Sequence, residues 1–117
     1  MILAAHQPQF APWLGFFDKL DRADVFVLLD NVQYKKNEWQ NRNRIKASTG
    51  PQWLTVPVSF RFGQTIGEVA INHRQKWQRQ HLASLRACYG RAPHFGSVFS
   101  LYEELLRRPW DRLSELN

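Results

Sequence analysis

The chain has very few of the residues and segments that mark several common protein classes. It holds one cysteine, Cys88, which excludes an internal disulfide and fits a reducing compartment. No apolar run reaches the roughly eighteen residues that a membrane-spanning helix needs, and no basic segment precedes the short apolar run at the amino end as in a signal peptide. We therefore expect a cytoplasmic protein without a membrane span.

The chain also lacks the short motifs of several enzyme classes. It has no glycine-rich phosphate loop, no dinucleotide-binding fingerprint and no Gly-x-Ser-x-Gly nucleophile elbow. A single cysteine excludes a zinc site built on several thiolates, and the four histidines include no i, i+4 pair. The sequence therefore predicts no bound metal, and it identifies no cofactor.

The composition is that of one globular domain with a positive charge. Of the 117 residues, 44% are hydrophobic and 14% aromatic, which is enough for a real core. We therefore predict a single α/β domain over residues 1–117. Sixteen Lys and Arg against ten Asp and Glu give a net charge of +6. This charge favours anionic partners such as phosphates, nucleotides or nucleic acid.

The first thirty residues have the pattern of a strand, a helix and a second strand. Unalternated apolar runs at 2–5 and 25–29 predict strands buried on both faces, and the segment from Trp13 to Leu20 has the apolar repeat of a short helix. Gly15 within this helix indicates a close backbone approach. The pattern is a Rossmann-like βαβ start, from which we expect a small, mainly parallel sheet flanked by helices.

The rest of the chain predicts further short elements. Residues 31–48 have no clean period and predict a polar loop. The later expected elements are a strand at 53–58, a short strand at 65–71, a helix from His73 to Tyr89 with Asn72 as N-cap, Gly90 at C′ and a buried His81, and a helix from Ser97 to Arg108. A further helical repeat begins at Trp110 and stops without a cap signal. We therefore expect the chain to be the N-terminal portion of a longer protein.

Two residues that can carry acid–base chemistry follow the first two predicted strands. Because the carboxyl ends of neighbouring parallel strands meet at one sheet edge, where open α/β sheets bind ligands, we expect His6 and Asp30 to stand side by side. An imidazole changes its charge near physiological pH, which suits a catalytic acid or base. We interpret both as candidate catalytic residues. The alternatives are that His6 stiffens the turn at Pro8 and that Asp30 belongs to an ordinary turn.

The segment from Gln33 to Lys46 carries the densest set of polar and basic residues. Two guanidiniums with interleaved amides offer the forked donors that phosphate oxygens accept, although a solvated basic loop has the same composition. Tyr34 and Trp39 can stack on a base or sugar or can fill the core, and we favour the core for Trp39. The candidate substrate-binding residues are Gln7, Gln33, Tyr34, Lys36, Asn41, Arg42, Asn43, Arg44 and Lys46.

Several motifs follow one another along the first half of the chain. They are His6-Gln7-Pro8, Pro12 to Lys19, Asp30 to Tyr34, Trp39 to Lys46, and Trp53 to Val58. In this order the sequence resembles the WbqC-like family of bacterial proteins, and Trp77, His81 and the segment from Tyr89 to Pro93 extend the resemblance. The resemblance implies a setting in surface-polysaccharide (O-antigen) and nucleotide-sugar synthesis, a longer chain, and no particular reaction.

These observations lead to three hypotheses. The first is a transferase that moves a group on a phosphorylated small molecule, such as a nucleotide-linked sugar. In it His6 is the acid or base, Gln7 and Asp30 orient hydroxyls, and Arg42, Arg44 and Lys46 hold phosphate. The second is a nucleic-acid-binding module that uses the basic loop 35–46 and the helix after Asn72. The third is a non-catalytic assembly protein. No pattern indicates an oligomeric state.

Overall fold

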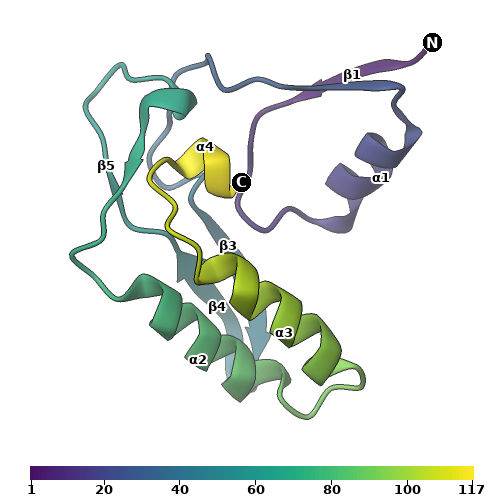
Figure 1. The fold of residues 1–117 in the computed structure, drawn as a ribbon, viewed down its shortest axis with the longest axis vertical. Coiled ribbons are helices and arrows are strands. Elements are labelled where there is room, and N and C mark those ends of the chain that lie inside the picture. Colours follow the sequence, from purple (N-terminus) through teal and green to yellow (C-terminus); the bar gives the residue numbers. More distant parts are fainter.

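The computed structural model describes all of residues 1–117 and shows two parts, which we call the N-terminal unit (residues 1–30) and the body (residues 31–117) (Figure 1). The strands are β1 (Leu3–His6), β2 (Val25–Leu28), β3 (Arg42–Ala47), β4 (Gly50–Thr55), β5 (Val58–Ser59) and β6 (Ala70–Ile71). The helices are α1 (Leu14–Arg22), α2 (Trp77–Tyr89), α3 (Phe95–Leu106) and the short α4 (Leu113–Leu116), with a 3₁₀ turn, η1, at Ile66–Glu68.

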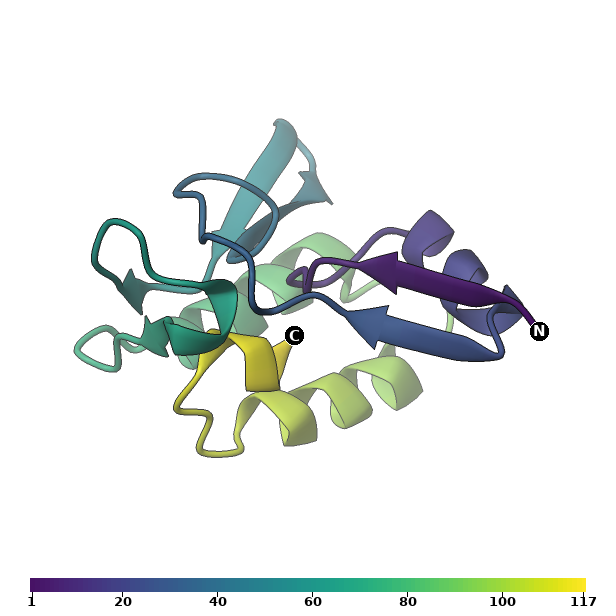
Figure 2. The ribbon, with the colours of Figure 1, turned by 90° about the horizontal axis from the view of Figure 1, so that it is seen from above.

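The N-terminal unit contains the predicted strand, helix and strand. β1 and β2 pair in parallel, with Leu3 opposite Val25 and His6 opposite Leu28, and α1 connects them (Figure 2). No third strand joins this pair. The expectation that both strands are buried on both faces is therefore wrong, since Leu3 and Leu28 remain 66% and 46% exposed.

The prediction of a mainly parallel sheet is also wrong. Helices and strands are mixed, as in an α/β protein, but β3 pairs with β4 and β5 with β6 in antiparallel fashion, and the three two-stranded sheets are separate. No Rossmann-like sheet is built on β1 and β2. The physical reason is that the later strands pair with one another and not with the first two strands, and short connections such as the turn between β3 and β4 allow only antiparallel pairing.

The predicted loop at 31–48 ends earlier than expected, because residues 42–47 form β3. Side chains alternate across the β3–β4 hairpin. Asn43 and Ile45 lie on the face that packs against the core with the buried Leu54, whereas Arg44 lies on the opposite face, directly across from Trp53. The strand was missed because one of its inward positions is the polar Asn43, which hides the alternation.

The hydrophobic core lies in the body, where α2 and α3 pack beside the hairpin (Figure 1). The predicted burial of His81 is confirmed, since its side chain is buried and its Nε2 bonds to the carbonyl of Thr55 at 2.8 Å. The N-terminal unit contributes only Phe10 to this core. The twelve clustered residues are Phe10, Tyr34, Leu54, Val56, Ile66, Val69, Ile71, Trp77, Leu82, Phe99, Leu106 and Leu113.

Several predicted boundaries differ from the structure. α2 begins at Trp77, and Asn72 accepts a hydrogen bond from the backbone N–H of Arg74 in a turn and does not cap the helix. Gly90 caps the end of α2 in a right-handed backbone conformation. Glycine is needed there because the Cβ of any other residue would collide with the carbonyl oxygen of Arg86. α3 lies two residues earlier than predicted, the strand at 53–58 is β4 at residues 50–55, and the strand at 65–71 is η1 followed by β6.

None of the helices combines the length and apolar character that crossing a bilayer requires.

Candidate functional site

His6 ends β1 and faces α1. Its ring centroid lies 5.6 Å from that of Trp13 and 5.1 Å from that of Phe16. The Lys19 ammonium donates to the carbonyl of Ala5 at 2.6 Å and lies 3.4 Å from His6 Nδ1. Burial and, to a lesser degree, the charge of Lys19 lower the pKa of His6. The imidazole is therefore uncharged at neutral pH.

Asp30 does not lie beside His6. Its carbonyl accepts from the backbone N–H of Gly67 at 2.8 Å, and a Cβ added to Gly67 would lie 3.2 Å from its Oδ2, so the carboxylate stands against η1. No hydrogen bond or ion pair joins His6 to Asp30, and the expected imidazole–carboxylate arrangement is not formed. The reason is that β2 ends at Leu28 and the chain then turns toward the body.

The loop after β1 and the segment before β3 are tied together by hydrogen bonds. Gln40 Nε2 donates to Gln7 Oε1 at 3.0 Å, Asn43 Nδ2 donates to the carbonyl of Ala11 at 2.7 Å, and the backbone N–H of Phe10 donates to the carbonyl of Trp39 at 3.1 Å. The structure therefore does bring the first loop and the polar segment together, with Gln7 and Asn43 holding the backbone in place.

A pocket of about 310 Å³ opens where these two segments meet, lined by Gln9, Trp13, Trp39 and Asn43. Trp13 is placed there because its indole lies over Gly15, where any Cβ would collide with the ring. The predicted close approach at Gly15 is thus confirmed. Two indoles and two amides in one pocket give flat apolar faces next to hydrogen-bonding groups, as small-molecule sites require.

One guanidinium, that of Arg44, lies near the Trp39 ring of this pocket, and a second, that of Arg42, lies over the neighbouring Trp53. The guanidinium carbon of Arg42 lies 4.1 Å from the Trp53 ring centroid, and that of Arg44 lies 5.4 Å and 5.8 Å from the Trp53 and Trp39 rings. Trp39 is exposed and stacks near Trp53, so the preference for a core position was wrong. No carboxylate pairs with either arginine. Cation–π contacts hold both guanidiniums, and Arg42 Nη2 also donates to the carbonyl of Asn37, so no carboxylate neutralises their charge but part of the Arg42 fork is already engaged.

The other candidate substrate-binding residues lie away from the pocket lining. Tyr34 is buried against Phe60, and burial raises its pKa while the charge of Arg42 opposes this. Asn41 is buried and donates to the carbonyl of Val56 at 3.1 Å. These two buried residues therefore hold the segment against the core and are not open to a ligand. The remaining three, Gln33, Lys36 and Lys46, are exposed on the surface.

Sequence reasoning did not select Gln9 and Trp13 as site residues. Trp13 was counted as part of the apolar stripe of α1, although it precedes the helix and is half exposed. A signal was available, because Pro8 and Pro12 bracket a stiff loop whose side chains cannot all turn inward.

Comparison with known proteins assigns the chain to a family. The sequence profile of the WbqC-like protein family matches residues 7–117. The chain belongs to the WbqC-like protein family. The uncharacterized protein Rv1507c of Mycobacterium tuberculosis is 42% identical to it over 98 residues, which are 82% of this chain and 42% of that protein. The chain therefore spans less than half the length of this WbqC-like relative. No solved structure matches it.

Proposed function

We propose that this WbqC-like protein acts by group transfer on a nucleotide-linked sugar in surface-polysaccharide synthesis. The observation that carries the proposal is the pocket lined by Trp13 and Trp39, with the guanidinium of Arg44 5.8 Å from the Trp39 ring and that of Arg42 over the neighbouring Trp53. A nucleotide-linked sugar has flat rings joined by a diphosphate. This combination matches aromatic faces next to unpaired cations.

The two indoles are the part of the site that receives a ring. Stacking of a base on an aromatic side chain contributes about 1–3 kcal/mol and depends little on which base it is. The Asn43 amide is engaged with the Ala11 carbonyl and with the backbone N–H of Arg44. Gln9 is therefore the lining amide that reads hydroxyls or a base edge.

The outer face of β3 is the part that receives phosphate. Three basic residues occupy alternate positions of this strand, namely Arg42, Arg44 and Lys46. They therefore lie on one face, with successive residues about 6.6 Å apart along the strand. Arginine binds phosphate oxygens with two parallel N–H groups, and lysine adds a point charge. The contact with Trp53 orients Arg42 before any ligand arrives, which lowers the cost of ordering its side chain.

In this proposal His6 is the acid or base of the transfer. Its ring contacts Trp13, which lines the pocket, and its lowered pKa keeps it in the form that accepts the proton of an attacking hydroxyl. Gln7 serves as a positioning residue through Gln40. Asp30 has no part in the step, because its carboxylate stands against η1.

The nucleic-acid hypothesis has less support from the placement of the charges. The core-facing side of the hairpin is the side on which α2 packs, as the hydrogen bond from Gln52 to Ser84 shows, whereas Arg44 lies on the other side. The hairpin arginines and α2 therefore do not lie on the same face of the hairpin. A steep loss of binding with salt would revive this hypothesis, since a chain of phosphate contacts is strongly salt-dependent.

The binding part of the proposal is tested by titrating nucleotide-linked sugars into the protein and its variants in a calorimeter. Trp39→Ala is expected to weaken binding by about tenfold or more, the loss of one stacking contact. Phe62→Ala removes an aromatic ring that is 97% exposed and does not line the pocket, so it is the matched control. Equal affinities for wild type and Trp39→Ala would contradict the assigned pocket.

The chemical part is tested by His6→Ala. We expect turnover of the nucleotide-linked sugar to fall by roughly 100-fold or more, the usual contribution of a general acid or base, while binding is retained. His94→Asn is the control, because Asn tolerates the left-handed backbone that His94 adopts. Full activity of His6→Ala would remove the acid–base role and leave the pocket assignment standing.

A further inference from the structure

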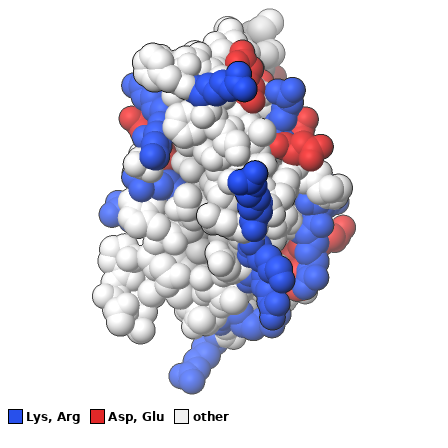
Figure 3. Space-filling view, turned by 90° about the vertical axis from the view of Figure 1, so that its left-hand side faces the viewer, with Lys and Arg blue, Asp and Glu red and all other residues white.

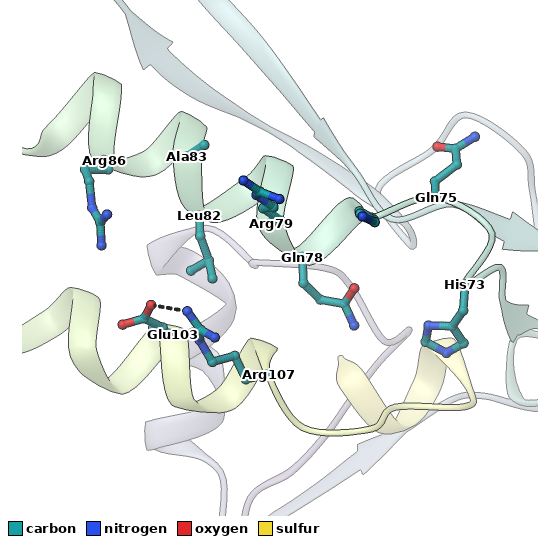
Figure 4. Close-up of a pocket in the computed structure, with 10 residues that line it drawn as sticks. His73, Gln75, Gln78, Arg79, Leu82, Ala83, Arg86, Glu103 and Arg107 are labelled. Carbon is teal, nitrogen blue, oxygen red and sulfur yellow. Dashed lines mark hydrogen bonds and ion pairs between the residues drawn. The ribbon is translucent and has the colours of Figure 1, made fainter.

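A second basic site lies in the groove between α2 and α3 (Figure 4). The groove has a volume of about 660 Å³ and is lined by side chains of both helices and of the turn before α2. Lys76, Arg79 and Arg86 come from the α2 side, Glu103 comes from α3, and Arg107 is the residue that caps the end of α3. None of these residues lines the pocket between Trp13 and Trp39.

The spacing of these residues in the sequence places their charges in one groove. Arg79 and Arg86 are seven residues apart, which is two helical turns and about 10.5 Å along α2, so they share one side of the helix. Glu103 and the C-cap residue Arg107 are four residues apart, so they are neighbours at the end of α3. Two helices thus present their charged sides to each other.

The groove has an excess of positive charge that the protein does not neutralise. Glu103 is the lining carboxylate, and it is engaged by Arg107 at 2.8 Å. Lys76, Arg79 and Arg86 form no ion pair. The face in Figure 3 likewise shows Lys and Arg side chains continuing down the lower half of the molecule, the half that α2 occupies, with few Asp or Glu among them.

We propose that this groove binds a linear oligophosphate anion through Lys76, Arg79 and Arg86. Three cations without ion pairs along one groove suit a ligand with several negative charges in a row, and phosphate oxygens accept hydrogen bonds from the forked N–H groups of guanidinium. The amide of Gln78 also points into the groove and supplies a further donor (Figure 4).

The groove recognises phosphate and no nucleobase. No phenylalanine, tyrosine or tryptophan lines it, and the ring of Phe99 is covered by the guanidinium of Arg86, 4.9 Å from its centroid. The one ring in the lining is the imidazole of His73, whose Nε2 lies 2.7 Å from the carbonyl of Trp110. A base therefore has no open phenyl or indole face to stack on. The site is distinct from the hairpin arginines and does not depend on the function proposed above.

The test is calorimetric titration of the 117-residue protein with sodium tripolyphosphate at low salt. We expect saturable binding that the double variant Arg79→Gln/Arg86→Gln weakens by about tenfold or more. The matched control is Arg61→Gln/Arg91→Gln, which removes the same charge at exposed positions outside both sites. An equal loss in the two double variants, or no binding by wild type, would overturn the proposal.

A single substitution tests the same groove in the opposite direction. Glu103→Gln removes the competing carboxylate and frees Arg107, so it is expected to tighten tripolyphosphate binding by a factor of about two to five. A folding defect cannot produce a gain in affinity. Unchanged or weaker binding in this variant would contradict the assigned groove.

The source of the phosphate is distinguished by a parallel titration with a nucleoside triphosphate. We expect Arg79→Gln/Arg86→Gln to remove the same component of binding for both ligands, because the groove contacts the phosphates alone, and any nucleoside triphosphate binding that this variant keeps to disappear in Trp39→Ala, because it belongs to the pocket between Trp13 and Trp39. A nucleoside triphosphate that binds more tightly than tripolyphosphate, and whose advantage disappears in the same double variant, would show that the groove reads the base and would overturn the phosphate assignment.

Discussion

The N-terminal unit and the body differ in how they are held together. The unit has a regular parallel pair and a helix, yet Phe16 is the buried hydrophobic residue that unites them, and apolar residues such as Leu14 and Val25 are exposed. The body has two separate antiparallel strand pairs and buries a connected cluster of twelve residues, to which the unit contributes Phe10. Local pattern was enough to form the elements of the unit, whereas stability depends on the core of the body.

The proposed pocket lies where these two regions meet. Trp13 comes from the unit, and Trp39 and Asn43 come from the body. The hydrogen bonds of Gln40 to Gln7 and of Asn43 to Ala11 bridge the same boundary. A weakly held region against a firmly held one is a typical arrangement for a binding site whose walls adjust to the ligand.

The largest expected difference is in the response to loss of a leucine side chain. Leu106→Ala, in the core, is expected to lower the free energy of unfolding by about 2–5 kcal/mol, because it removes a fully buried side chain and leaves a cavity. Leu14→Ala, in the unit, is expected to change it by about 0.5 kcal/mol or less, since its side chain is 86% exposed. Urea denaturation measures both. Similar losses of unfolding free energy in the two variants would show that the unit contributes to stability as much as the core of the body does.

A smaller difference is expected in hydrogen exchange. The backbone N–H of Leu29 donates to the carbonyl of His6 within the unit, and that of Val56 donates to the carbonyl of Asn41 within the body. We expect the Leu29 amide to exchange about a hundredfold faster or more, because the unit opens locally without unfolding the core. Equal protection of the two amides would show that the unit and the body unfold as one.

The smallest effect concerns two histidines, one in each region. Burial is the main cause that lowers the pKa of both His6 and His81. As the pH falls through 6.5, these histidines take up protons in the unfolded chain before they do so in the folded protein. The free energy of unfolding therefore decreases below pH 6.5 and levels off once the pH is below the folded-state pKa values. We expect both imidazoles to titrate below 6.5 in NMR spectra.

One substitution separates these two histidines. Lys19→Met removes the second cause acting on His6, so it is expected to raise the pKa of His6 part of the way toward its ordinary value and to leave His81 unchanged. If His6 instead titrates at the same pH with and without Lys19, the arrangement at the end of β1 is wrong.

The fold was predictable where neighbouring residues decide it. The apolar repeats gave β1, α1 and β2, and Gly15 indicated the place where Trp13 approaches the helix. Strand pairing beyond these was not predictable, because it depends on contacts between distant segments. The hairpin strand β3 was hidden by Asn43, whose inward place reflects its hydrogen bond to Ala11 and not an apolar side chain.

The candidate site was predictable in part for a similar reason. The sequence selected the polar segment from Gln33 to Lys46, and the structure brings its Asn43 to the loop after His6. It placed Asp30 wrongly, because a sheet edge was assumed for a chain that turns away after Leu28. It also could not show that Trp39 stays exposed, since exposure depends on what packs above a residue.

The most direct test of the central claim follows the indole N–H signals of the five tryptophans by NMR while a nucleotide-linked sugar is added. The account predicts that the signals of Trp13 and Trp39 move and saturate together while that of the buried Trp77 stays in place. Saturating shifts that leave Trp13 and Trp39 unmoved, or no shift at all, would contradict it.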